Sequence, residues 1–329
     1  MTSRWLRRHA HSTANTLAPR VAARWATDIF SSTRTYGLRP DNTLPLGATP
    51  FTVHGNKDVT DGFLWNENAT RGSALLVHGW AANSSSMHSL VPPLRNLGLR
   101  VAAFDGPAHG VRPGNQATMT QYTQATGAVL DTLGDVRVVV AHSLGSIAAI
   151  AAIAEHTGRI PECAVLIAPP AALGDVLERW DGAGLRLTPP LVEGIYRELH
   201  RRNGVPVSHW DLTTRAAALD IPTLILHDPH DPMVPYTDAR TVTAGLKNAH
   251  LTDTDGGHTG ILTSRTTTTH LTHFTTQHLT TPHTNNPHLT TTPHTPTPNN
   301  PHPHQHTHTH PHPHPHPHPH PHPHHEGTT

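Results

Sequence analysis

The sequence predicts an α/β fold in which a mostly parallel sheet is covered by helices on both faces. Short runs rich in β-branched residues alternate with longer helical patterns from about residue 73 to residue 278, and this alternation is typical of parallel sheets. The residues best suited to chemistry follow these runs, as expected where functional groups gather at the carboxyl ends of strands. The final segment has almost no apolar residues to bury, so the fold is built from the residues before it.

The N-terminal 48 residues form an extension ahead of the predicted sheet. Its arginines precede the first acidic residue, Asp28, which gives a superficial likeness to a transit peptide, but no long apolar stretch follows. Four larger apolar residues fall at helical spacing: Val21, Trp25, Ile29 and Phe30. We therefore predict that residues 1–48 are a helical extension whose helix packs on the body of the protein.

Eight apolar runs predict strands. In chain order they are FTVHG (51–55), GFLWN (62–66), SALLVHGW (73–80), LRVAAFD (99–105), DVRVVV (135–140), ECAVLIAPP (162–170), PTLILHD (222–228) and the weaker AHLTDT (249–254). We expect the first two to form an antiparallel pair and the others to form the parallel sheet.

Helical patterns separate these strands, and in one place the alternation of strands and helices is broken. A segment from Ser84 to about Leu97 is helical, although Pro92 and Pro93 must kink or split it. Further helices are predicted at about 118–133, after residue 143, at 237–246 and from about 257 to 278. Residues 171–218 contain helical patterns but no convincing strand. We interpret them as a helical cap inserted into a body that spans residues 49–279.

Residues 135–150 carry the strongest functional pattern. A β-branched run leads into Ala141-His142-Ser143-Leu144-Gly145, and an apolar helical segment follows. A serine on a sharp strand-to-helix turn exposes its hydroxyl, and such a turn accepts only small residues two positions before and after the serine. Ala141 and Gly145 meet this requirement. The alternative is a serine that only caps the N-terminus of a helix.

Five motifs occur in a consistent order along the chain. They are HGW (78–80), DGPAHG (105–110), AHSLG (141–145), HDPHDPMVP (227–235) and GGHTGIL (256–262). Together they resemble the α/β-hydrolase superfamily, and in particular a bacterial branch with an HGW oxyanion loop and an AHSLG nucleophile elbow. The resemblance spans roughly residues 51–262, with alanine at position 141 where glycine is commoner. It implies the α/β-hydrolase fold.

The resemblance also implies roles for five residues. It places the nucleophile on Ser143, the acid on Asp231 and the base on His258, and it assigns the oxyanion hole to the backbone N–H groups of Trp80 and Leu144. A serine hydroxyl is a poor nucleophile until a base accepts its proton, and the imidazolium that forms needs a carboxylate. The developing oxyanion needs hydrogen-bond donors.

Each assignment has an alternative. Asp228 competes with Asp231 because both lie in one loop; the family spacing favours Asp231, and Asp228 would then serve the turn. His258 could instead be an exposed loop histidine. Three further histidines are expected to support the site rather than to catalyse: His78 behind the oxyanion loop, His109 in a family turn and His142 beside the nucleophile.

Residues 280–329 are predicted to be a disordered tail rich in His, Pro and Thr. Alternating His and Pro invite a metal-binding interpretation because imidazole is a common ligand. In a polyproline II helix, however, alternating histidines return to one face only about every 19 Å, so two of them chelate one ion poorly. No metal site is assigned with certainty, and the weak candidates are His302, His304, His324 and His325.

Composition limits the possible functions. The formal net charge is zero with neutral histidine, so no basic field indicates nucleic acid. No segment is apolar enough to suggest a membrane span. The single cysteine, Cys163, lies in an apolar run, which suits a reducing compartment and a cytoplasmic location.

The function expected from these features is hydrolysis of a carboxylic ester or related acyl compound through an acyl-enzyme intermediate, without a cofactor. The expected partner is therefore a small-molecule acyl substrate. Two alternatives remain at this stage. One is a catalytically silent binding protein with the same fold, and the other is a metal-handling protein that acts through its tail.

Overall fold

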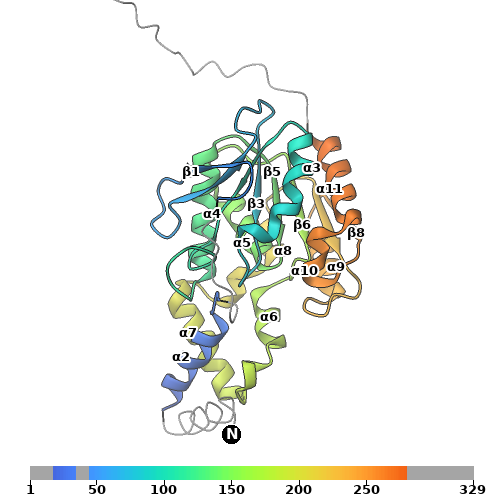
Figure 1. Cartoon of the computed structure of the whole chain (residues 1–329). Helices are drawn as coiled ribbons and strands as arrows, with labels where there is room; N and C mark the ends of the chain where they lie inside the picture. The colour runs from blue at the N-terminus through green and yellow to red at the C-terminus, as the bar shows by residue number, and fades with distance from the viewer. Residues whose placement is uncertain (1–17, 35–43, 280–329) are drawn as a thin grey trace, which may run out of the picture. The chain divides into compact units, whose positions relative to one another are not determined.

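The computed structural model describes residues 18–34 and 44–279. The predicted tail at 280–329, with its candidate metal ligands and any divalent metal bound there, lies outside the described residues. The described chain contains one eight-stranded sheet with the order β1-β2-β4-β3-β5-β6-β7-β8 (Figure 1). Its strands are β1 (Ala48–Thr52), β2 (Asp61–Trp65), β3 (Ser73–Val77), β4 (Arg100–Ala103), β5 (Val136–His142), β6 (Cys163–Ile167), β7 (Thr223–His227) and β8 (Ala249–Asp253).

The sheet is mostly parallel, as the sequence predicted. Strands β3 to β8 pair in parallel, whereas β2 pairs antiparallel with both β1 and β4. The first strand begins three residues before the predicted position because its pairing starts at Ala48 opposite Trp65 and ends at Thr52 opposite Asp61. The α/β-hydrolase fold class is confirmed.

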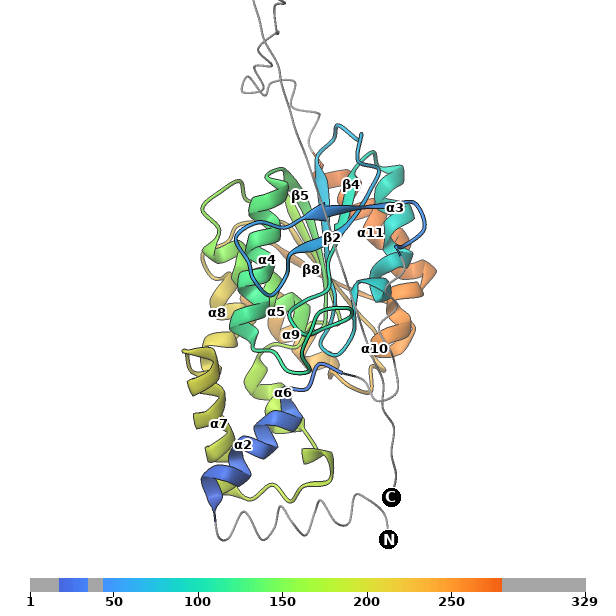
Figure 2. The same cartoon turned by 60° about the vertical axis from the view of Figure 1, so that its left-hand side comes forward.

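Helices cover both faces of the sheet (Figures 1 and 2). One face carries α4 (Met119–Leu133), α5 (Leu144–Glu155), α8 (Leu212–Ala216) and α9 (Tyr236–Gly245), and the other carries α3 (Val91–Asn96), α10 (Gly257–Gly260) and α11 (Arg265–His278). Between β6 and β7 the chain also forms α6 (Leu173–Arg179) and α7 (Pro189–Asn203), with no strand between them.

The helical segment that contains Pro92 and Pro93 is split into two helices. Residues Ser84–Leu90 form a 3₁₀ helix, and α3 begins directly after it with proline in its first turn. Proline is tolerated there because the first N–H groups of a helix have no partner within the helix.

The strands bury alternate residues on opposite faces, which produces two hydrophobic cores. In β3, Leu75 and Val77 belong to the core under α4 and α5, whereas Ala74 and Leu76 belong to the core under α3 and α11. Cys163, at the start of β6, is fully buried on the second face. Burial raises the pKa of its thiol to about 12, so the thiol is unreactive in the folded protein.

The N-terminal helix differs in detail from the expected one. Helix α2 (Pro19–Phe30) packs on α7, but it buries its small residues Ala22, Ala23 and Ala26 while Val21 is exposed. Val21 was therefore wrongly placed on the packed face, whereas Ile29 and Phe30 of the expected stripe are half-buried against the core. The reason is close approach: a Cβ added to Gly194 of α7 would lie 2.7 Å from the Cβ of Ala23.

None of the helices in the described ranges combines the length and apolar character needed to cross a bilayer.

Candidate active site

Ser143 occupies a sharp turn between β5 and α5. Its backbone has φ 51° and ψ −132°, a conformation with positive φ that is rare for a residue with a side chain. Gly145 is required two residues later, because a Cβ there would lie 2.2 Å from the carbonyl oxygen of His78. Ala141 is fully buried at the end of the strand, and its single methyl group is tolerated in that core.

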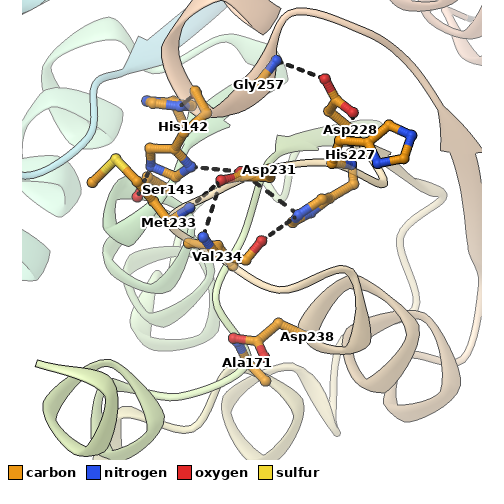
Figure 3. Close-up of polar contacts among 12 residues, drawn as sticks. His142, Ser143, Ala171, His227, Asp228, Asp231, Met233, Val234, Asp238 and Gly257 are labelled. Carbon is orange, nitrogen blue, oxygen red and sulfur yellow. Dashed lines mark hydrogen bonds and ion pairs between the residues drawn. The ribbon is translucent and has the colours of Figure 1, made fainter.

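The structure brings Ser143, His258 and Asp231 into one chain of hydrogen bonds (Figure 3). The Ser143 Oγ lies 3.0 Å from His258 Nε2, and His258 Nδ1 lies 2.7 Å from Asp231 Oδ2. Because a carboxylate accepts at Nδ1, that nitrogen carries the proton and Nε2 is free to accept one from the hydroxyl. The side chain of Asp231 has no exposed surface, so water competes little for this contact.

The Asp231 carboxylate is held by its own loop. Its Oδ1 accepts hydrogen bonds from the backbone N–H groups of Met233, at 2.7 Å, and Val234, at 3.0 Å. Burial alone would raise the pKa of this carboxyl, but the hydrogen bonds from His258, Val234 and Met233 outweigh burial and lower the pKa. Asp231 therefore stays ionised at neutral pH.

Asp228, the competing acid, does not contact His258 through its carboxylate. It accepts hydrogen bonds from the backbone N–H groups of His230, at 2.8 Å, and Gly257, at 2.6 Å. These two bonds lower the pKa of its carboxyl. Asp228 therefore stabilises its own turn and also ties that turn to the segment that begins α10, directly before His258 (Figure 3).

Of the two expected oxyanion donors, Leu144 directly follows Ser143, and Trp80 follows Gly79, which packs against His142 and Ser143. Leu144 is the first residue of α5, where the backbone N–H has no partner within the helix. Trp80 lies in the loop after β3, and neither N–H donates to another backbone carbonyl within the residues described. Both N–H groups are thus available to a ligand.

His78 organises the loop that carries Trp80. Its Nδ1 contacts the Gly79 carbonyl at 2.7 Å, and its Nε2 accepts the Gly106 N–H at 2.9 Å. Tyr122 donates its hydroxyl to the His78 carbonyl at 2.6 Å. Burial lowers the pKa of His78, so the ring is neutral and can both donate and accept.

Two other buried histidines lie beside this loop. Burial and a neighbouring histidine lower the pKa of both His109 and His142 to about 3. His109 contacts the Pro107 carbonyl at 2.9 Å, which fits the structural role expected for it. His142 contacts the backbone carbonyl of His258 at 2.8 Å through Nε2, and its ring packs 4.9 Å from the His258 ring.

An apolar cavity of about 140 Å³ opens beside the turn. Trp80 and Leu144, the expected oxyanion residues, form one part of its wall. Segments far apart in sequence supply the rest: Phe30, Ser31, Ala117, Thr118, Met119, Leu173, Val176, Trp180, Leu199 and Asn203.

Sequence reasoning missed most of this wall and the contact of His142 with the His258 carbonyl. Phe30 was named only for the helical spacing of the extension, and no motif marks Trp180, which lies far from it in the sequence. The His142 contact joins residues 116 apart through a backbone carbonyl, so no local pattern could reveal it. Within residues 18–34 and 44–279, no group of three His, Cys, Asp or Glu could hold a metal ion.

Comparison with known proteins supports the fold. Among solved structures, the chain resembles Est1E of Butyrivibrio proteoclasticus with bound ferulic acid, at 16% identity and a TM-score of 0.58, over 70% of this chain and 99% of that one. An esterase of Pyrococcus furiosus gives 17% identity and a TM-score of 0.58, over 76% and 97% of the two chains. Alpha/beta hydrolase domain-containing protein 10 of mouse gives 16% identity and a TM-score of 0.54, over 70% and 98%.

Comparison of the sequence itself is more specific. A non-heme haloperoxidase of Rhodococcus erythropolis is 26% identical over 220 residues, which cover 53% of this chain and 80% of that protein. The model of the alpha/beta hydrolase family matches residues 74–271, which is more than half of the chain and includes the turn at Ser143 and both partner loops. The chain therefore belongs to the alpha/beta hydrolase family and is an enzyme of the hydrolase class.

Proposed function

We propose that this protein is a serine hydrolase that cleaves a carboxylic ester or a related acyl compound. The observation that carries the proposal is the chain of contacts from Ser143 through His258 to Asp231, next to an apolar cavity. A hydroxyl on a strained turn, an imidazole beside it and a buried carboxylate form the arrangement that activates a serine.

The reaction follows from this geometry in two stages. The Ser143 Oγ attacks the acyl carbon while His258 Nε2 takes its proton, and Asp231 stabilises the imidazolium. The oxyanion accepts hydrogen bonds from the Trp80 and Leu144 N–H groups, and the alkoxide leaves with the proton from His258. Water then attacks the acyl-enzyme with His258 again as base, which releases the acid and restores Ser143.

The domain organisation belongs to the same proposal. The body at 49–279 carries the three proposed catalytic residues, and the cap insertion at 171–218 supplies Leu173, Val176, Trp180 and other parts of the cavity wall. The extension at 1–48 adds Phe30 and Ser31 to that wall. The buried single cysteine supports the proposed cytoplasmic location.

A fluorophosphonate probe tests the proposal directly. We expect it to add one phosphonyl group to the full-length protein, with peptide mapping that places the group on Ser143, because only an activated serine reacts readily. The protein should also hydrolyse p-nitrophenyl acetate. A folded protein that is neither labelled nor active would favour the catalytically silent binding protein.

Two measurements separate other activities from esterase activity. The named activity of the Rhodococcus relative is tested by halide oxidation with hydrogen peroxide, compared between the parent and Ser143→Ala. The alternative in which the tail binds a divalent metal is tested by equilibrium dialysis of the full chain against a chain ending at Leu279. Metal binding that stays with the shorter chain would exclude the tail as its site.

A further inference from the structure

The cavity beside Ser143 has a definite size and chemistry. Its volume is about 140 Å³, close to the ~150 Å³ of an apolar cavity that holds benzene. Three aromatic side chains contribute to its wall: Phe30, Trp80 and Trp180. Trp80 and Leu144 line it, and Leu144 directly follows Ser143, so this cavity is the space that we assign to the acyl group.

We propose that the enzyme selects esters of a compact, uncharged acyl group of about the size of a benzene ring, and that helix α2 sets the upper limit of that size through Phe30. This inference rests on the function proposed above and adds to it the substrate class. A long unbranched acyl chain would exceed the volume of this cavity.

The lining explains why a charged acyl group is excluded. No charged side chain occurs among the described residues of the wall. Two of its polar side chains are already engaged: Thr118 caps α4 by accepting the Gln121 N–H, and Asn203 binds the Thr120 N–H and the Leu199 carbonyl. An ion placed here would lose its hydration and would meet no side chain of opposite charge, which is unfavourable.

Helix α2 is fixed well enough to act as a wall. At the cap, Arg202 of α7 forms an ion pair of 2.6 Å with Asp28, and Gly194 allows α2 to approach closely at Ala23. Phe30, at the last turn of α2, lies edge-to-face against Trp180 at 5.3 Å between ring centroids. This aromatic pair joins α2 to the end of α6.

The segment after α2 is fixed to the body. The Trp80 indole donates to the Ser32 carbonyl at 2.9 Å, and Thr33 donates its hydroxyl to the Ala108 carbonyl at 2.7 Å. Arg34 donates to the carbonyls of Gly110 and Gly114 in the same loop. The backbone at Phe30 is therefore held between the cap and the loops after β3 and β4, and its ring packs against Trp180.

Residues 74–271 match the family model, and α2 lies before them. The part of the wall made by Phe30 and Ser31 is therefore supplied from outside the matched region. The residue proposed to set the size limit therefore lies in the extension, outside the part of the chain that the family model matches.

The test compares p-nitrophenyl acetate, benzoate and decanoate, with each kcat/KM divided by the alkaline hydrolysis rate of the same ester. We expect the parent enzyme to prefer benzoate over decanoate by about 10–100-fold, the range that pocket size provides. Phe30→Ala should reduce this preference at least fivefold. Val176→Phe, which narrows the cavity from the cap side, should lower benzoate turnover and largely spare acetate.

Val21→Ala is the matched control, because Val21 lies on the same helix and is exposed. It should leave all three rates at the parent values. A second readout needs no turnover: labelling rates with phenylmethanesulfonyl fluoride and hexadecylsulfonyl fluoride, followed by intact mass, should show the same preference and the same loss in Phe30→Ala.

The outcomes separate the two proposals. Acetate turnover and Ser143 labelling without a preference for benzoate, or with a preference that Phe30→Ala and Val176→Phe leave unchanged, would overturn the acyl-group inference and leave the hydrolase proposal standing. Failure of every ester and of every serine probe would overturn both.

Discussion

The two sides of the proposed site are built differently. On the sheet side, Ser143, Asp231 and His258 lie in short loops directly after β5, β7 and β8, where each polar group has a specific partner. On the cap side, α2, α6 and α7 contribute mainly apolar side chains that only need to fill a volume. Chemistry depends on hydrogen bonds set to tenths of an ångström, whereas selectivity for an apolar group depends on the space left by packing.

Ser143→Ala is expected to have the largest effect on the sheet side. It should lower esterase kcat by on the order of 10⁴–10⁶ because the nucleophile is lost. The melting temperature should stay near the parent value, since the hydroxyl contributes little packing. Steady-state rates with p-nitrophenyl acetate and thermal unfolding by circular dichroism are the measurements. Substantial turnover by the purified variant would refute the assignment of the nucleophile.

The two aspartates of the β7 loop should differ strongly. Asp231→Asn should lower kcat by on the order of 10⁴, because an amide cannot hold the required His258 tautomer in the same way. Asp228→Asn retains one acceptor for its backbone partners and should cost about tenfold or less, in keeping with a single weakened hydrogen bond. Rates of both variants should be measured at one pH. The reverse order would move the proposed acid to Asp228.

Two glycines differ in the room that an added Cβ would have. Gly145→Ala should reduce the free energy of unfolding by about 1–3 kcal/mol or more, because its Cβ would collide with the His78 carbonyl. Gly127→Ala, in α4 with nothing within 4 Å of its added Cβ, should be neutral or gain up to about 1 kcal/mol from helix propensity. Urea unfolding measures both. Equal effects would contradict the tight turn.

The buried histidines predict that acid lowers the free energy of unfolding, an effect smaller than those of the substitutions above. The pKa values of His109 and His142 are about 3 in the folded protein and near the ordinary ~6.5 when unfolded. Between pH 3 and pH 6.5 the unfolded chain binds more protons than the folded one. The stability that these neutral histidines contribute is therefore fully present above pH 6.5 and is lost as the pH falls toward 3. At pH 5 the loss should be about 2 kcal/mol per histidine.

Melting temperatures from pH 7.5 to 5 measure this slope. His109→Gln should make the slope shallower, whereas His230→Gln removes an exposed side chain and should leave it as in the parent. An unchanged slope in His109→Gln would mean that His109 is protonated in the folded protein.

The same contrast explains which features the sequence could predict. Buried strands and the loops after them carry local patterns, so the sheet, the turn at Ser143 and the positions of Asp231 and His258 could be read from short segments. The cavity wall joins Phe30 to Trp180 across 150 residues through packing alone. Apolar spacing indicated that α2 would be helical, but it could not show that Val21 is exposed, because Gly194 on α7 decides which face approaches.

Cys163 gives the protein an internal reporter of unfolding. It is the single cysteine of the chain, it is fully buried in a central strand, and its raised pKa of about 12 keeps the thiol protonated. A thiol reagent can therefore react only during events that separate β6 from its cover, to which α11 contributes. The rate of modification at neutral pH then counts how often the central sheet opens, without any introduced label.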